Sequence, residues 1–84
     1  MEEPDVVWVL EGYGKADDVL RAEHPISREQ IRRLRDVIAP DADDPWMLRC
    51  YPVPFDRWPA VDAILRCGPP RPDLDYLTGA HTAG

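Results

Sequence analysis

Few residues of the sequence carry the nucleophiles that enzymes use for covalent catalysis. The only aliphatic hydroxyls are those of Ser27, Thr78 and Thr82, and there are two cysteines and two histidines. The Ser27 hydroxyl is expected to cap a helix, which commits it to a structural hydrogen bond. Because a hydrolase or transferase needs a nucleophile, a base and an orienting group in one cleft, we expect no catalytic residues and no enzymatic activity.

Signals for phosphate binding and for a large pocket are also missing. Gly12, Gly14 and Lys15 lie close together, but they lack the spacing of a P-loop, and no Ser or Thr follows the lysine. A chain of 84 residues leaves little volume for a pocket of about 300 Å³ beside its core. A very small enzyme that uses His24 as a base is therefore the least favoured functional hypothesis.

Cysteine and histidine are too sparse to indicate a metal centre. Cys50 and Cys67 form no C-x-x-C pair, and a zinc site would need both of them together with His24 and His81. We expect two free thiols in a reducing compartment, with a disulfide as the alternative. The sequence therefore predicts no metal and no cofactor.

Long apolar runs are absent. The longest, residues 6–10, is far shorter than the roughly 18 apolar residues of a membrane-spanning helix. Residues 1–5 are acidic, whereas a secretory signal begins with a basic region that an apolar region follows. The sequence therefore predicts a cytoplasmic protein with no membrane partner.

Acidic residues outnumber basic ones, which bears on the kind of partner. The sequence has 16 Asp and Glu against 10 Lys and Arg, so its net charge is −6. Affinity for nucleic acid comes mainly from Lys and Arg that displace counterions from phosphates, so no nucleic-acid partner is expected. A basic protein is the better match. The leading hypothesis is a protein-interaction domain, most specifically an immunity-type or antitoxin-type inhibitor of a basic partner.

Hydrophobic periodicity predicts the elements of the first half. Residues 6–10 and 19–24 predict two strands joined by a hairpin turn. Ser27 and Gln30 have the spacing of a capping box, which predicts the start of a helix over residues 28–38. A β-hairpin followed by a helix is therefore expected.

The second half has weaker signals. Residues 47–53 predict a third strand. Asp56 is the predicted N-cap of a second helix, whose regular part begins at Pro59 and whose C′ residue, just after its end, is predicted to be Gly68. Residues 74–77 are expected to dock on the core, with a short strand as one form that this segment could take.

Together these elements predict an α+β fold. We expect a three-stranded antiparallel sheet packed by two helices, in the order ββαβα, with a docked C-terminal segment. At this length, residues 1–77 form a single domain. Residues 78–84 are small and are expected to form a flexible tail.

An acidic loop lies between two prolines and precedes a tryptophan. It contains Asp41, Asp43 and Asp44, followed by Trp46. A calcium loop is excluded because Trp46 and Pro52 stand where that motif needs glycine and glutamate. Two interpretations stay open: a stiff connector whose aspartates cap turns, or an acidic surface with an aromatic anchor for a basic partner.

Two more aromatic residues complete the predicted contact surface. The predicted partner-binding residues are Asp41, Asp43, Asp44, Trp46, Tyr51 and Trp58. The alternative function is an accessory subunit or small homodimer in a biosynthetic pathway, with Trp8, Tyr51 or Trp58 on a hydrophobic sheet face.

Short motifs along almost the whole chain resemble one protein family. They are the segment 7–13, then Ser27 with Ile31 and Leu34, Asp43-Asp44-Pro45, Tyr51-Pro52-Val53, and the segment 73–77. In this pattern the sequence is similar to a family of small uncharacterised bacterial domains. The resemblance implies an arrangement of elements and no activity. Pro54 and Pro59 depart from the expected pattern, at the start of the second helix.

Overall fold

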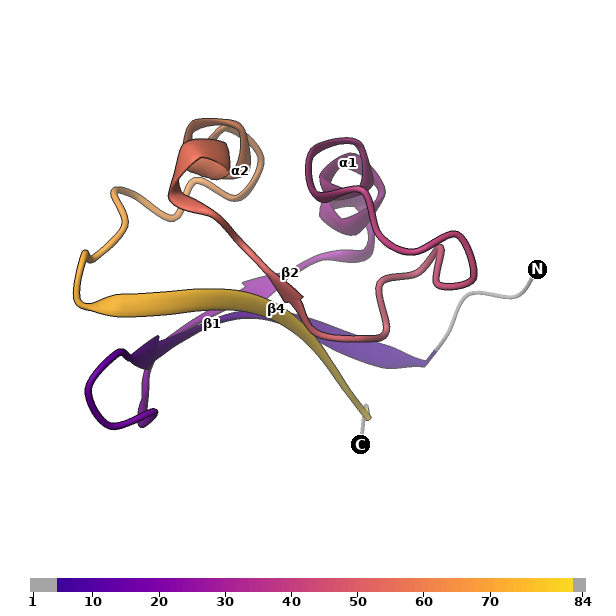
Figure 1. Cartoon of the computed structure of the whole chain (residues 1–84). Coiled ribbons are helices and arrows are strands. Elements are labelled where there is room, and N and C mark those ends of the chain that lie inside the picture. The colour runs from indigo at the N-terminus through magenta and orange to yellow at the C-terminus, as the bar shows by residue number, and fades with distance from the viewer. Residues whose placement is uncertain (1–4, 83–84) are drawn as a thin grey trace.

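The computed structural model describes residues 5–82 (Figure 1). Four strands, two α-helices and one short 3₁₀ helix follow one another along the chain. In order they are β1 (Val6–Gly14), β2 (Leu20–Ile26), α1 (Arg28–Ile38), β3 (Tyr51–Pro52), the 3₁₀ helix η1 (Phe55–Arg57), α2 (Trp58–Leu65) and β4 (Leu74–Thr82). The α+β class and the two helices are confirmed.

The sheet has four strands, not the three that the sequence predicts. Its order is β2-β1-β4-β3, and every neighbouring pair is antiparallel. The additional strand is β4, which lies between β1 and β3 in the middle of the sheet. The observed order of elements is therefore ββαβαβ, and the segment expected to dock is instead a central strand.

Strand β4 also corrects the predicted domain boundary. It pairs with β1 from Leu74 opposite Gly14 to Thr82 opposite Val6, so residues 78–82 belong to the sheet and not to a flexible tail. Residues 83–84 lie outside the described part of the chain. The backbone supplies the ladder hydrogen bonds, so the small side chains of Gly79 and Ala80 are no obstacle to a strand.

Helix α1 forms where its capping residues predict it. The Ser27 hydroxyl accepts a hydrogen bond from the Gln30 amide, and the Gln30 side chain accepts one from the Ser27 amide. These two bonds satisfy amides that have no partner within the helix. Ile31 and Leu34 are fully buried and face the sheet.

Helix α2 begins and ends differently from the prediction. It starts at Trp58, directly after η1, and its N-cap is Arg57 instead of Asp56. At the other end Arg66 takes the left-handed conformation, with φ of 54°, so the helix stops before it reaches Gly68. Gly68 instead donates its amide hydrogen bond to the Asp62 side chain.

Strand β3 is much shorter than the predicted strand over residues 47–53. Met47 has a φ of 51°, which breaks an extended chain. Leu48 and Arg49 donate their amides to the Asp44 carboxylate instead of to a neighbouring strand. Only Tyr51 and Pro52 therefore pair with β4.

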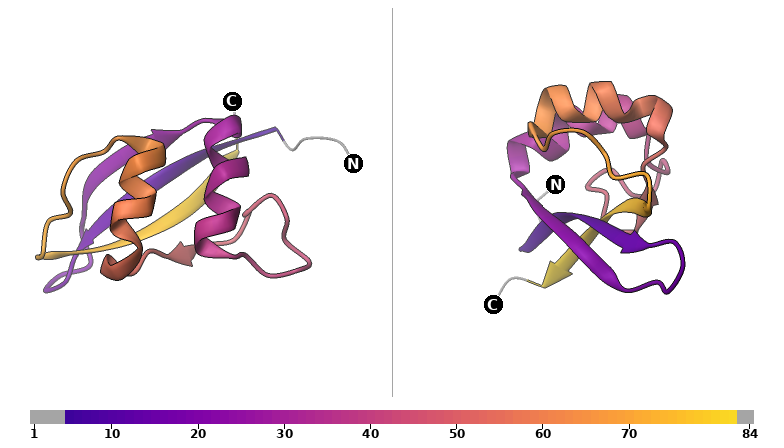
Figure 2. Two further views of the ribbon diagram at one scale, coloured as in Figure 1. Left: turned by 90° about the horizontal axis from the view of Figure 1, so that it is seen from above. Right: turned by 90° about the vertical axis from the view of Figure 1, so that its left-hand side faces the viewer.

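Both helices pack on the same face of the sheet. Figures 1 and 2 show α1 and α2 side by side in one layer, with the strands in a second layer below them. The core between the layers contains Trp8, Leu10, Ile26, Ile31, Leu34, Met47, Tyr51, Val53, Trp58, Val61, Leu65, Leu74 and Tyr76. No described helix or loop forms a layer on the opposite face of the sheet.

Candidate functional site

The uncovered face of the sheet, here called the open face, is defined by the alternation of side chains along β1. Trp8 and Leu10 are buried against the helices, so their neighbours Val7 and Val9 point the other way. Cross-strand partners share a face. The open face therefore contains Val7, Val9, Glu11 and Tyr13 of β1, Glu23 of β2, and Asp75, Leu77, Gly79 and His81 of β4.

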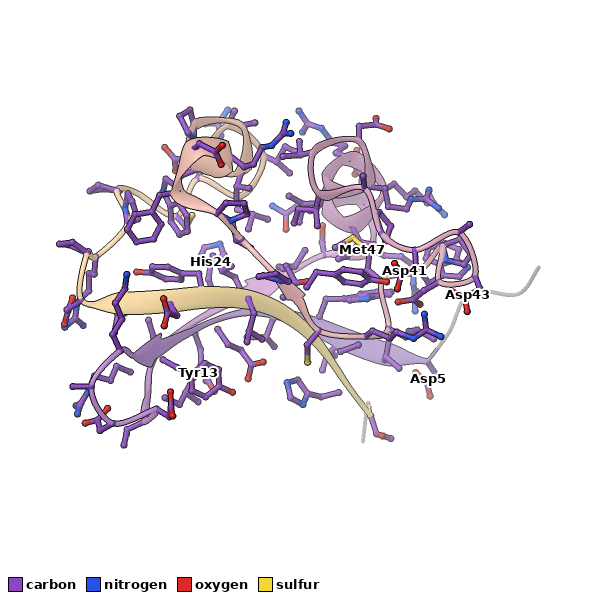
Figure 3. The ribbon with its side chains drawn as sticks, in the orientation of Figure 1. Asp5, Tyr13, His24, Asp41, Asp43 and Met47 are labelled. Carbon is purple, nitrogen blue, oxygen red and sulfur yellow. The ribbon has the colours of Figure 1, made fainter. Side chains whose placement is uncertain are left out.

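Glu11 is a buried carboxylate on this uncovered face. It is 6% exposed, although no helix lies over it. The Tyr13 hydroxyl donates a long hydrogen bond of 3.3 Å to Glu11 Oε2. His81 Nε2 lies 3.4 Å from the same oxygen, so a protonated His81 would form an ion pair with it. Figure 3 shows Tyr13 on the side of the sheet away from both helices.

A glycine makes room for this carboxylate. A Cβ atom at Gly79 would lie 2.5 Å from Glu11 Oε1, closer than atoms can approach. Glu11 Oε1 itself accepts no hydrogen bond from any residue in the range 5–82. The carboxylate thus has one oxygen with two long contacts and another without a hydrogen-bond donor.

The surroundings of Glu11 are acidic. Glu23 is directly opposite Glu11 on β2, and Asp75 is opposite Tyr13 on β4. The pKa of Tyr13 lies above its ordinary value because of its burial, the charge of Glu11 and its hydrogen bond to Glu11. Negative charge near Tyr13 therefore disfavours its phenolate.

A hollow of about 540 Å³ adjoins the open face beside β4, on the side of β4 that faces away from β1. It is lined by Lys15, Pro52, Val53, Pro54, Phe55, Asp75, Tyr76 and Leu77. At its rim Lys15 Nζ lies 3.6 Å from Asp75 Oδ1 and 5.3 Å from the centre of the Phe55 ring. This volume exceeds what the chain length predicts, because the hollow is a surface feature and takes no space from the core.

The exposed aspartates of the acidic loop are paired within the chain. Arg49 donates two hydrogen bonds to Asp43, at 2.8 and 3.0 Å, and one to Asp41, at 3.2 Å. Hydrogen bonds from Arg49 and its charge hold the pKa of Asp43 below its ordinary value. The loop therefore supplies one positive charge, Arg49, for its two exposed aspartates.

Asp44 of the same loop is buried and accepts several hydrogen bonds. It is 5% exposed and accepts hydrogen bonds from the Leu48 amide, the Arg49 amide and the Tyr51 hydroxyl, the last at 2.6 Å. Burial by itself raises the pKa of Asp44, but these hydrogen bonds outweigh it and leave the pKa below its ordinary value. This carboxylate organises the chain around it, as the connector interpretation requires.

The aromatic residues of the predicted surface lie mostly inside the protein. Tyr51 and Trp58 belong to the core. Trp46 is half-buried beside Trp8, with their ring centres 6.3 Å apart, and the Arg35 guanidinium lies 5.4 Å from its ring centre. Of the predicted partner-binding residues, Asp41 and Asp43 are the exposed ones, and Figure 3 shows both in the loop beside α1.

His24 and Cys67 both line a small hollow of about 120 Å³. His24 faces the helices, where its Nε2 lies 3.1 Å from the Leu65 carbonyl oxygen. Cys50 and Cys67 are both free. Burial and the charge of Asp62 raise the pKa of Cys67, which disfavours the reactive thiolate. Within residues 5–82, no group of three or more His, Cys, Asp or Glu residues is arranged to hold a metal ion.

Glu11, Tyr13 and His81 were not identified as a group by sequence reasoning. Glu11 follows an apolar run, and only the alternation from Trp8 and Leu10 would have placed it on the opposite face. The sequence pattern places His81 in the predicted tail, so it gives no sign of the pairing of His81 opposite Val7. A prediction of β4 as a strand would have been needed to bring the three together.

The fold and this surface define a class of protein: a two-layer α+β domain with helices on one sheet face and a carboxylate buried on the other. The chain belongs to a family described as a domain of unknown function (DUF7683), whose sequence model matches residues 7–66. No curated protein and no solved structure matches the chain. The family match ends before β4 begins, so it does not include Asp75, Leu77, Gly79 or His81.

The helices of the described chain are all too short or too polar to cross a membrane.

Proposed function

We propose that this protein is a small protein-interaction domain that binds a basic partner protein through its open face. The observation that carries the proposal is the face itself: a central β-sheet with helices on one side and no covering element in residues 5–82 on the other. A sheet normally buries at least one face, and a second face with apolar side chains is a surface on which a partner can pack.

The apolar part of the open face supports this function. Val7 is 50% exposed, and Phe55 is 41% exposed at the neighbouring hollow. The hollow adjoins the centre of the face, because Leu77 in its lining is the cross-strand partner of Glu11. An apolar side chain of a partner could fill the hollow while the surrounding strands contact the rest of the partner.

The charge of the face favours a basic partner over a second copy of the chain. Lys15 pairs with Asp75, which leaves Glu11 and Glu23 as the acidic residues of the face, with His81 beside Glu11. Two such faces would repel each other, whereas a basic surface would be attracted, and this attraction would mainly accelerate association. The homodimer alternative is therefore disfavoured for this surface.

The outer edge of β2 is a poorer binding surface than the open face. Pro25 lies within β2 and has no amide hydrogen to donate to an added strand. The same strand also carries the charged side chains of Arg21 and Glu23, which discourage pairing with an added strand. We therefore place the contact on the face of the sheet.

The inhibitor hypothesis is a special case of this proposal. It requires that the partner be an enzyme, such as a nuclease toxin, and that binding cover its basic active site. Asp41 and Asp43 would contribute at the side of the contact only if Arg49 released them. The proposal also includes a cytoplasmic location, where Cys50 and Cys67 would stay reduced.

Site-directed cross-linking tests the surface. A benzophenone amino acid would replace Val7 on the open face, and a matched variant would carry it at Arg33 on the exposed side of α1. We expect a discrete cross-linked product in the native cell from position 7 and none from position 33, with a captured protein of positive net charge. Equal cross-linking from both positions, or capture of an acidic protein from position 7, would contradict the proposal.

A further inference from the structure

We propose that Glu11, Glu23 and Tyr13 form a binding site for one arginine side chain of the partner. This inference rests on the proposed function and specifies its central contact. It begins from Glu11, a carboxylate whose oxygen Oε1 has no hydrogen-bond donor in the described chain and whose oxygen Oε2 has only the long contacts to Tyr13 and His81.

The Glu11 side chain is only 7% exposed, but its Oε1 is not fully enclosed: in residues 5–82 the fully buried side-chain oxygen without a hydrogen-bond partner is Thr78 Oγ1. Buried charges in proteins are normally paired and fully hydrogen-bonded, because removing them from water is costly. Asp44 of the same chain follows that rule, with three donors around it. Glu11 differs because its Oε1 accepts no hydrogen bond from residues 5–82 and is open at the surface, where a cationic ligand could donate to it.

A second carboxylate stands on the same side of the site. Glu23 is directly opposite Glu11 on β2. Side chains opposite each other in antiparallel strands have Cβ atoms about 5 Å apart, and like charges there are destabilising. A cation between the two carboxylates would convert this repulsion into two attractions.

The neighbouring groups favour arginine over lysine. The planar guanidinium has a fork of donors that matches carboxylate oxygens and can stack on an aromatic ring, whereas the lysine ammonium is a point charge. Tyr13 is the aromatic residue next to the two carboxylates: its hydroxyl donates to Glu11, and burial together with the charges of Glu11 and Glu23 raises its pKa. His81 is 54% exposed at its side chain, so it can move aside when the guanidinium approaches.

The hollow beside β4 predicts which kind of residue lies next to the arginine in the partner. Asp75 and Leu77 line it and are the cross-strand partners of Tyr13 and Glu11. A side chain in the hollow would therefore be one strand away from the guanidinium. The expected partner segment has an arginine next to an apolar residue.

A peptide titration followed by NMR of the full-length protein tests the site. The probe is the blocked peptide acetyl-Val-Arg-Val-amide, compared with the same peptide carrying lysine or norleucine in the centre. We expect amide shifts at Glu11, Tyr13 and Glu23, with affinity in the order arginine, lysine, norleucine. Because Glu11→Gln removes the negative charge that accepts the guanidinium hydrogen bonds, it should weaken arginine-peptide binding about tenfold or more.

The control variant is Asp36→Asn, which makes the same change in net charge on the exposed side of α1. It should leave the affinity within about twofold. Glu23→Gln, at an exposed position, provides a second variant that tests the site even if Glu11→Gln alters the fold, and it should also weaken binding. Equal affinities for Glu11→Gln, Glu23→Gln and Asp36→Asn would overturn the arginine site.

Failure of this site is distinguishable from failure of the proposed function. If position 7 still cross-links a basic protein while the three central residues show no arginine preference, the open face binds its partner by another contact. If neither experiment gives a signal at the open face, both proposals are wrong.

Discussion

The acidic loop and the open face both contain buried carboxylates, but the two regions use them differently. Asp44 in the loop has three hydrogen-bond donors from its own chain, whereas Glu11 on the open face has two long contacts to one oxygen. The loop carboxylate is therefore part of the fold. The carboxylate on the open face keeps one oxygen, Oε1, that accepts no hydrogen bond from residues 5–82.

The same contrast extends to the exposed acids. Asp41 and Asp43 form ion pairs with Arg49, whereas Glu23 lies opposite a second carboxylate, Glu11, on the neighbouring strand. A net charge of −6 does not reveal this difference, because it counts paired and unpaired carboxylates alike. Charge on a small acidic domain becomes informative about binding only after the internal ion pairs are removed from the count.

The largest expected effect is the loss of stability on replacing Asp44. Asp44→Ala would leave the amides of Leu48 and Arg49 and the Tyr51 hydroxyl without their acceptor. Unsatisfied buried donors of this kind cost about 1–3 kcal/mol each, partly relieved by water, so we expect a total of roughly 3 kcal/mol. Urea unfolding measures it, and a loss below about 1 kcal/mol would show that the loop does not depend on Asp44.

The pH dependence of stability should have the same origin. The pKa of Asp44 is lower in the folded protein, so its contribution to stability is present above the unfolded-state pKa and is lost as the pH falls through the folded-state pKa. Asp44→Asn should therefore flatten the acid side of the stability curve. Thermal melts between neutral and strongly acidic pH measure it, and an unchanged acid slope would contradict this assignment.

Glu11→Gln should have a smaller effect of the opposite sign. The change removes the repulsion from Glu23 and the cost of burying a charge, so stability should rise by up to about 1 kcal/mol. The pKa of Tyr13 should fall, because the nearby negative charge that disfavours its phenolate is gone. Urea unfolding and an ultraviolet titration give the two readouts. If Glu11→Gln destabilised the protein as much as Asp44→Ala does, then Glu11 would be a structural carboxylate like Asp44, and the contrast between the two regions would be wrong.

The sequence predicts the parts of the fold that depend on local chemistry. Helix α1 has the predicted bounds because Ser27 and Gln30 provide a capping box and Ile31 and Leu34 share one face. The hairpin of β1 and β2 is likewise expected from the glycines and aspartates between the strands, although each strand extends further than predicted. Local signals were sufficient for these elements.

Other parts depend on contacts between distant residues and were not predictable. The small residues Gly79 and Ala80 of β4 give no strand pattern in the sequence. Only their pairing with β1 identifies them as part of a strand. The predicted third strand is short because Asp44 takes the amides of Leu48 and Arg49. The open-face site needs β4 in place, so no pattern within a single segment could have indicated it.

The most direct test of the account compares one carboxylate from each region in a single binding experiment. The affinity of acetyl-Val-Arg-Val-amide would be measured by NMR titration for the unmodified protein, Glu11→Gln and Asp43→Asn, two variants that change the net charge equally. The account predicts about tenfold weaker binding for Glu11→Gln and little change for Asp43→Asn, because Arg49 already neutralises Asp43. Equal loss in the two variants, or a larger loss for Asp43→Asn, would contradict it.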